Sequence, residues 1–260
     1  MNSDWLLPQW PESRHVHALC TTRAGGTSLP PFDSLNLGDH VGDSATAVAA
    51  NRALMQGAMG VSTVFMSQVH GVAVAILSEN TAHGVIADAC VTTQRGLACS
   101  VMVADCLPVL LSDQRGTVVA AAHAGWRGLA GQGGHGVLEA VISALHRARG
   151  QDRWNADSQL FAWLGPCIGP RAFQVGMDVR EAFVSDSREP ATMFRRQAGD
   201  KWLADLPGLA RLRLAALGVT RIYGNDGTDA WCTFSNPSRY FSHRRDRVSG
   251  RMAACIWLEG

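Results

Sequence analysis

Three residues of the sequence, His70, Cys106 and His123, have side chains that could act together on a metal ion or a substrate. Each lies where a run of apolar residues ends, which places each near the end of a predicted strand. They are too far apart for one helix, but neighbouring strands can bring them together. Two imidazoles and a thiolate are the ligands of a catalytic zinc ion that keeps a fourth position for water. Such an ion would deprotonate Cys106 and lower the pKa of the water to about 7.

The same three residues have two other interpretations. Cys106 with His70 or His123 is also the pattern of a thiolate nucleophile and its base, because a positioned imidazole lowers the pKa of a thiol. Alternatively, all three are ordinary core or loop residues, since cysteine is among the most buried residue types. Residue types and spacing leave all three interpretations open.

Five short motifs, two of them outside the three candidate ligands, occur in one order along the chain: Ser-Leu-Asn-Leu-Gly at 34–38, Ser-Gln-Val-His-Gly at 67–71, Ala-Asp-Cys-Leu-Pro at 104–108, His-Ala-Gly-Trp-Arg-Gly at 123–128 and Arg-Arg-Asp-x-x-x-Gly-Arg-Met at 244–252. Together they resemble the YfiH-like laccase-domain family. That family is also called polyphenol oxidase or peptidoglycan-editing factor, and some members are described as purine nucleoside phosphorylases. The resemblance runs nearly end to end, so we expect a single domain over residues 1–260.

The resemblance implies a zinc site formed by His70, Cys106 and His123, each at the ligand position of its own motif. It also implies two activities on purine nucleosides, namely phosphorolysis of adenosine, inosine and 5′-methylthioadenosine, and hydrolytic deamination of adenosine. A zinc hydroxide can attack C6 of adenine, as in other zinc deaminases. The small-molecule substrates would then be a purine nucleoside and phosphate.

Two other functions stay open. The peptidoglycan-editing name implies an amidase that uses Cys106 to remove a wrong amino acid from a peptidoglycan precursor. The second open function is a non-catalytic module that binds zinc or a partner. Its zinc site would be closed by four ligands. Bound metal would distinguish the amidase from a zinc enzyme. The nucleophilic cysteine of an amidase must be free, whereas a cysteine that binds zinc is occupied.

Phosphorolysis needs a phosphate bound near C1′ of the ribose, and guanidinium groups suit that task. Arg52, on the first predicted helix, and Arg127 are the candidates. Gln68 lies two residues before His70, on the same face of an extended segment, and is expected to line the site. Asp105 is a candidate to orient a ligand histidine, although strand alternation points it to the opposite face from Cys106.

Three other features receive a structural interpretation. Arg244, Arg245 and Arg251 form a basic cluster that we interpret as solvated surface. Gln174 stands where the family usually has a glutamate, which removes a carboxylate. Residues 131–136 contain G-x-G-x-x-G, the spacing of a dinucleotide-binding turn, but they lie too far from the preceding strand and no regular βαβ repeat accompanies them.

A true laccase is excluded by counting histidines. A multicopper oxidase needs several His-x-His pairs, whereas this chain has 9 histidines and a single such pair, His15 and His17. Copper binding by the His/Cys set in vitro is still expected, because copper heads the affinity series of divalent metals. Oxidase activity would then be incidental.

Apolar periodicity and capping residues predict an α+β fold, a single compact domain of the YfiH-like type with mixed β-sheets and flanking helices. Strands come in clusters with few helices between them, which does not fit a regular βαβ alternation. The predicted helices are 43–59, 137–149 and 206–217, and the predicted strands are 61–66, 72–77, 97–103, 109–111, 117–122, 160–164, 221–224 and 252–258.

Charge and cysteine content exclude several classes of protein. The 23 Lys and Arg residues against 22 Asp and Glu give a net charge of +1, so bulk charge favours neither nucleic acid nor an acidic membrane. The 7 cysteines are odd in number and lack paired spacing, which argues against a disulfide framework. The first residues lack the basic and long apolar stretches of a signal peptide, so we expect a reducing, cytoplasmic location.

Overall fold

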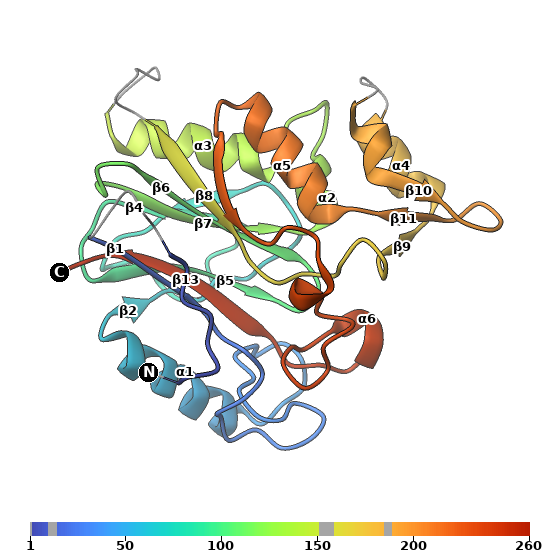
Figure 1. Ribbon diagram of the computed structural model, residues 1–260. Helices are drawn as coiled ribbons and strands as arrows, with labels where there is room; N and C mark the ends of the chain where they lie inside the picture. Colours follow the sequence, from blue (N-terminus) through green and yellow to red (C-terminus); the bar gives the residue numbers. More distant parts are fainter. Residues whose placement is uncertain (1, 10–14, 151–158, 185–188) are drawn as a thin grey trace.

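The computed structural model describes residues 2–9, 15–150, 159–184 and 189–260 (Figure 1). The helices are α1 (Ala45–Met59), α2 (Trp126–Ala130), α3 (Val137–Ala148), α4 (Met177–Val184), α5 (Leu206–Ala216) and α6 (His243–Asp246), with 3₁₀ helices at Glu189–Met193 and Asp229–Trp231. The strands are β1 (Val16–Cys20), β2 (Ser62–Thr63), β3 (Val74–Ile76), β4 (Ala89–Thr92), β5 (Leu97–Val103), β6 (Leu107–Asp113), β7 (Val119–Ala124), β8 (Leu160–Leu164), β9 (Gln174–Val175), β10 (Phe194–Arg196), β11 (Trp202–Ala204), β12 (Arg221–Gly224) and β13 (Met252–Leu258).

Two mixed sheets form the centre of the molecule. One has six strands in the order β12-β8-β6-β7-β4-β3, and the other has four in the order β1-β13-β5-β2. The pairs β12/β8, β3/β4 and β2/β5 are parallel, and the other pairs within these two sheets are antiparallel. The predicted α+β domain with mixed sheets and flanking helices is confirmed.

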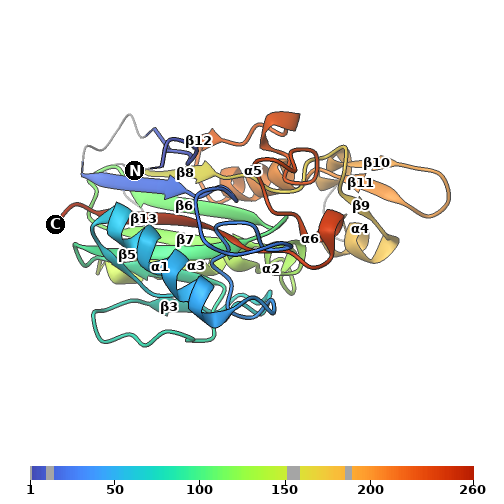
Figure 2. The same cartoon turned by 90° about the horizontal axis from the view of Figure 1, so that it is seen from below.

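The sheets stack face to face between two layers of helices. Cys99 and Ile256 of the four-stranded sheet share a buried cluster with Leu110 and Val119 of the six-stranded sheet. Helices α3 and α5 cover the other face of the six-stranded sheet (Figure 1). Helix α1 crosses the outer face of the four-stranded sheet, where Met55 contributes to a further buried cluster (Figure 2). Burial of both faces explains why the central strands are continuous apolar runs.

Helix α1 also holds the segment that precedes it. Ser44 caps its first turn, and Gly60 ends it with a φ of 70°. Asn51 is fully buried; its side-chain amide donates to the carbonyls of Ser34 and Asn36 at 3.2 and 2.9 Å. The chain between β1 and α1 is therefore fixed against the helix although it contains no regular strand.

Most of the predicted elements are confirmed, and the strands predicted at 109–111 and 117–122 correspond to β6 and β7. The three predicted helices correspond to α1, α3 and α5, and the strands predicted at 97–103, 160–164, 221–224 and 252–258 match β5, β8, β12 and β13. Strands β2 and β3 are shorter than predicted. Strand β4 and the small sheet β10-β11-β9 were not predicted, because segments of two to four residues carry too little periodicity, and the eight-residue helix α4 was not predicted either. In the described parts of the chain, no helix has the length and apolar character needed to cross a membrane.

Candidate metal centre and cavity

The residues His70, Cys106 and His123 meet at one point, which their positions near predicted strand ends allowed. His123 is in β7, Cys106 is in the turn between β5 and β6, and His70 is in the loop between β2 and β3. The three ligand atoms lie within 4.8 Å of one another, and Cys106 Sγ is 3.7 Å from His70 Nε2. Among the described residues, this is the cluster of His, Cys, Asp or Glu that could hold a metal ion.

The donor set fits a zinc-like ion. A thiolate with two imidazoles is a soft, nitrogen-rich set that suits zinc better than magnesium or calcium. His70 is exposed, Cys106 is half-buried and His123 is buried, so the site is open on the side of His70. Three protein ligands and an open side are typical of a catalytic metal site, whereas a structural site is closed by four ligands.

Asp88, which the sequence analysis missed, organises this site. Its carboxylate is fully buried and lies 2.9 Å from His123 Nδ1. It also accepts backbone N–H bonds from Val69, His70 and Gly71 at 3.2, 2.8 and 2.7 Å. The bond at Nδ1 leaves His123 Nε2 free to bind a metal. One buried acid therefore orients one ligand and fixes the loop that carries another.

The charges of the site favour a thiolate. Burial opposes ionisation of Cys106, but the His123 and His70 imidazoles outweigh burial and lower the pKa of Cys106 to about 6. Burial likewise opposes the charge on His123, yet Cys106 and Asp88 raise its pKa to about 9. Burial raises the pKa of Asp88, and the hydrogen bonds from His123 and the backbone lower it by more, so the net direction is down. Without a metal, the site is a thiolate beside an imidazolium.

The glycine of the His-Ala-Gly-Trp-Arg-Gly motif makes room for the ligands. A Cβ on Gly125 would lie 2.9 Å from His70 Cδ2 and 3.0 Å from Cys106 Sγ, closer than carbon atoms normally approach. His70 and Asp105 have φ values of 62° and 87°, in the left-handed region that disfavours residues with a Cβ. Such strain is typical of functional sites, where surrounding contacts hold it in place.

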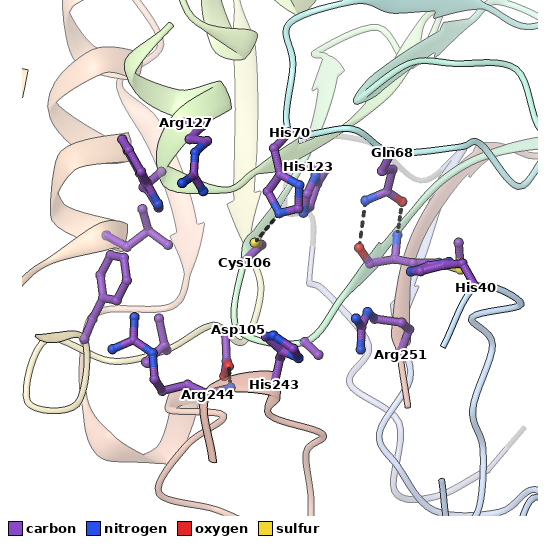
Figure 3. A pocket seen from close by; sticks show the side chains of 16 residues that line it. His40, Gln68, His70, Asp105, Cys106, His123, Arg127, His243, Arg244 and Arg251 are labelled. Atoms are coloured by element: carbon purple, nitrogen blue, oxygen red, sulfur yellow. Dashed lines mark hydrogen bonds between the residues drawn. The ribbon is translucent and has the colours of Figure 1, made fainter. Parts of the chain in front are cut away.

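The metal centre opens into a cavity of about 290 Å³ (Figure 3). Arg127 and Arg244 lie on one side of the ligands, and Arg251 and His40 lie on the other. The side of Arg127 and Arg244 combines positive charge with aromatic rings: Arg127 lies 4.4 Å over the Trp126 ring, and Arg244 lies 5.5 Å over the Phe173 ring. The lining residues are His40, Gln68, His70, Met102, Ala104, Asp105, Cys106, His123, Trp126, Arg127, Ile168, Phe173, Leu206, His243, Arg244 and Arg251.

Gln68 and Arg127 line the cavity, as expected from the sequence, but Arg52 does not. The Arg52 guanidinium donates to the Leu37 carbonyl at 2.9 Å, pairs with Asp39 at 3.1 Å and lies 4.0 Å over the Phe65 ring. The prediction that Arg52 binds phosphate is therefore wrong in geometry, because packing has turned its side chain to the loop that precedes α1.

Gln68 and Asp105 both use their polar atoms within the protein. The Gln68 amide donates to the Met102 carbonyl at 2.8 Å and accepts from the Met102 N–H at 2.7 Å. Asp105 accepts from the Thr233 hydroxyl and from the backbone N–H of Arg244, both at 2.6 Å. The orienting role considered for Asp105 is thus filled by Asp88, and Asp105 joins the C-terminal segment to the cavity.

The basic cluster near the C-terminus is not simply solvated surface. Arg244 and Arg251 line the cavity, whereas Arg245 turns away and donates to the carbonyls of Thr233 and Tyr240. Gln174 is exposed, and its backbone carbonyl accepts from Arg244 at 2.8 Å. Since the Gln174 side chain does not line the cavity, the missing carboxylate removes no group from the site.

The two alternative motifs have structural roles. The glycines at 131–136 form a turn between α2 and α3, where Arg213 donates to the Gly134 carbonyl, and they do not follow a strand as a dinucleotide-binding turn does. His15 pairs with Glu259 at 3.1 Å, and His17 stacks on Trp257 at 5.8 Å between ring centres; neither is among the residues that line the cavity. The seven cysteines are free, as predicted.

The lowered pKa predicts an unusual reactivity for Cys106. In metal-free protein, we expect iodoacetamide to alkylate Cys106 first, at a rate that is half-maximal near pH 6 and falls about tenfold per pH unit below that. Burial raises the pKa of Cys20 to about 12, so that thiol should stay unreactive. Mass spectrometry of digests locates the label, and added zinc should protect Cys106. A Cys106 rate that still rises between pH 8 and 9 would contradict the thiolate assignment.

The chain is similar to proteins of known name over almost its whole length. It is 46% identical to "Purine nucleoside phosphorylase YfiH" of Escherichia coli, over 98% of this chain and 99% of that protein. It is 44% identical to "Purine nucleoside phosphorylase PA4543" of Pseudomonas aeruginosa, over 98% of each chain.

Solved structures show the same fold. Protein NMB0706 of Neisseria meningitidis superposes with a TM-score of 0.89 at 44% identity, over 99% of this chain and 100% of that one. YlmD of Geobacillus stearothermophilus superposes with a TM-score of 0.84 at 30% identity, over 98% and 96%. The family model described as "Multi-copper polyphenol oxidoreductase laccase" matches residues 17–259. With its YfiH-named relatives and its single His-Cys-His cluster in the described residues, the chain belongs to this laccase-like family.

Proposed function

We propose that the protein is a zinc enzyme that catalyses phosphorolysis of purine nucleosides, with adenosine, inosine and 5′-methylthioadenosine as substrates. The observation that carries the proposal is the open His70–Cys106–His123 cluster inside a cavity that aromatic side chains and three arginines line. The names of the relatives at 44–46% identity support the same reaction.

In this reaction the bond between C1′ and N9 of the purine breaks, and a phosphate oxygen forms a new bond to C1′. The electron pair of the broken bond passes to the purine, which takes up a proton, so that free base and ribose 1-phosphate result. Trp126, Phe173 and Leu206 offer apolar walls that fit a purine ring. Zinc, when bound, supplies Lewis-acid stabilisation of negative charge. Asp88 keeps His123 in the tautomer that can hold it.

Adenosine deamination is the second activity that we propose for this centre. Water supplies the oxygen at C6, the C6–N bond breaks, and ammonia leaves. The open side of the metal centre at His70 favours this reaction, because three protein ligands leave room for a water.

Product analysis on protein of measured metal content tests both activities. With adenosine and phosphate, we expect adenine and ribose 1-phosphate; without phosphate, we expect only inosine. A chelator should abolish both phosphorolysis and deamination, and added zinc should restore them, because both activities need the same centre. Stoichiometric zinc with no product from any of the three nucleosides would contradict the proposal.

A cysteine amidase is the competing function, because Cys106, His123 and Asp88 are also placed as nucleophile, base and orienting acid. An amidase of this kind would release an amino acid from a peptidoglycan precursor in the presence of the chelator. It would be inhibited by zinc, which occupies the thiolate.

A further inference from the structure

Two of the five sequence motifs contain no metal ligand, yet they interlock beside the cavity. Asn36, in the Ser-Leu-Asn-Leu-Gly motif, accepts the backbone N–H of Arg251 at 2.8 Å. The Leu37 N–H donates to the Arg251 carbonyl at 3.0 Å. Gly38 leaves space for the Arg251 side chain, since a Cβ there would lie 2.7 Å from Arg251 Cγ. The two motifs thus fix the position of Arg251 at the cavity wall.

Arg251 is both rigid and incompletely bonded. Its Nη1 donates to the carbonyls of Ser249 and Gly250 at 2.8 and 3.2 Å, which fixes the guanidinium. Among the described residues, Nε and Nη2 of Arg251 have no hydrogen-bond partner within the protein. Guanidinium donors held in place are the groups that bind an oxyanion with two parallel bonds.

His40 adds a second donor at the same side of the cavity, next to Arg251 in Figure 3. Burial and the neighbouring Arg251 charge lower the pKa of His40, despite the opposing effect of Asp39, which favours the neutral imidazole. The neutral form still offers one N–H. Asp39 itself pairs with Arg52 at 3.1 Å.

The three arginines that line the cavity outnumber its negatively charged groups, which are the Asp105 carboxylate and the Cys106 thiolate. Of the lining residues in the described part of the chain, Asp105 is the one carboxylic acid, against Arg127, Arg244 and Arg251. Both Asp105 oxygens accept short hydrogen bonds from Thr233 and from the Arg244 backbone. The charges of Cys106 and Asp105 act on Arg251, and a bound anion would offset the positive charge of the arginines that remains.

The proposed phosphorolysis needs a cavity that binds the purine on one side and the phosphate on the other. Phosphate must reach C1′ from the face opposite the departing base, so base and phosphate bind on opposite sides of the ribose. The aromatic side, with Trp126 and Phe173, suits the purine. Arg251 and His40 lie across the metal ligands from Arg127 and Arg244.

We propose that Arg251 and His40 form the subsite for inorganic phosphate, the second substrate of the proposed phosphorolysis. This inference rests on the proposed function. Arg127, a phosphate candidate from the sequence, lies over Trp126 on the purine side and contacts the nucleoside in this arrangement.

The test compares Arg251→Gln with Arg244→Gln, the same change on opposite sides of the cavity. With inosine saturating and inorganic phosphate varied, Arg251→Gln should raise the KM for phosphate by about 10–100-fold, the effect of losing charge-assisted hydrogen bonds. The KM for inosine should change by less than about threefold. Arg244→Gln should leave the KM for phosphate within about threefold. Arg251→Lys should recover part of the affinity, because it restores charge without the bidentate fork.

Calorimetric titration of the zinc-loaded protein with phosphate measures phosphate binding without nucleoside cleavage, so it tests the subsite independently of the proposed function. Phosphate binding that is weakened in Arg251→Gln supports the subsite even if no nucleoside is cleaved, in which case only the proposed function fails. Phosphorolysis with an unchanged phosphate KM in Arg251→Gln overturns the subsite and leaves the function standing. If Arg251→Gln does not fold, His40→Ala serves instead: a severalfold rise in the phosphate KM supports the subsite, and no rise overturns it.

Discussion

Replacing Cys106 by alanine is expected to remove both the bound metal and the activity. The sulfur is one of three ligand atoms within 4.8 Å of one another, and two imidazoles without a thiolate bind zinc far more weakly. We expect the purified variant to hold less than about a tenth of the wild-type zinc. Phosphorolysis should fall about 10³-fold, since the metal contributes several kcal/mol to stabilisation of the transition state. Metal analysis by mass spectrometry and a product assay on the same sample measure both quantities.

A second cysteine provides the control. Cys20 is fully buried in β1, and burial raises the pKa of its thiol to about 12, so it serves only packing. Cys20→Ala should keep stoichiometric zinc and wild-type turnover while it loses about 1 kcal/mol of stability through the small cavity left. A Cys106→Ala protein that retains full zinc would overturn the ligand assignment. Full zinc without activity would instead favour Cys106 as a nucleophile.

Replacing Asp88 by asparagine is expected to weaken zinc binding by about 10–100-fold, the usual effect of losing a carboxylate that supports a ligand histidine. An asparagine offers one acceptor oxygen, whereas the Asp88 carboxylate accepts from His123 and from three backbone N–H groups with both oxygens. At least one of these donors would face an NH₂ group. Competition with a chromogenic zinc chelator measures the affinity, and excess zinc should restore part of the activity.

Stability gives a second readout for Asp88. We expect Asp88→Asn to lower the free energy of unfolding by about 2–4 kcal/mol, because buried donors lose their acceptor. The pKa of Asp88 is lowered in the folded protein, so its contribution to stability is present at neutral pH and is lost as pH falls through the folded pKa. The difference between wild type and variant should therefore shrink in acid.

Asp105→Asn is the matched control for Asp88→Asn. Asp105 lines the same cavity, but its carboxylate bonds to Thr233 and the Arg244 backbone and not to a ligand histidine. Zinc affinity of Asp105→Asn should stay within about threefold of wild type. An equal loss of affinity in the two variants would show that general loosening of the cavity, and not the bond to His123, explains the result for Asp88.

Local residue pattern was enough to single out the candidate ligands and the main elements, and the resemblance to the laccase-domain family joined those candidates into one site. His70, Cys106 and His123 have side chains that can bind a metal, and the structure places them in the loop after β2, in the turn after β5 and in β7, respectively. Helices α1, α3 and α5 were visible for a similar reason, since each has a long periodic pattern and a glycine close after its last turn. These features depend on neighbours in sequence, so they could be read without a structure.

The positioning residues depended on the fold. Asp88 looks like a polar residue at the start of a short strand, and no local signal shows that it meets His123 and the 69–71 backbone. The sequence made Arg52 a phosphate candidate and Arg251 a residue of the solvated surface, but the first packs on Phe65 and the second lines the cavity.

The sequence by itself therefore determined which groups can do chemistry here, because that property belongs to residue type and to the local strand that ends beside it. Only the tertiary structure decided how those groups are oriented and which arginines serve them. The bond from the Arg251 backbone to Asn36 joins residues 215 positions apart, and its geometry follows from the stacking of two sheets and the packing of α1. Hydrogen bonds of this kind have no periodicity along the chain, so no sequence pattern predicts them.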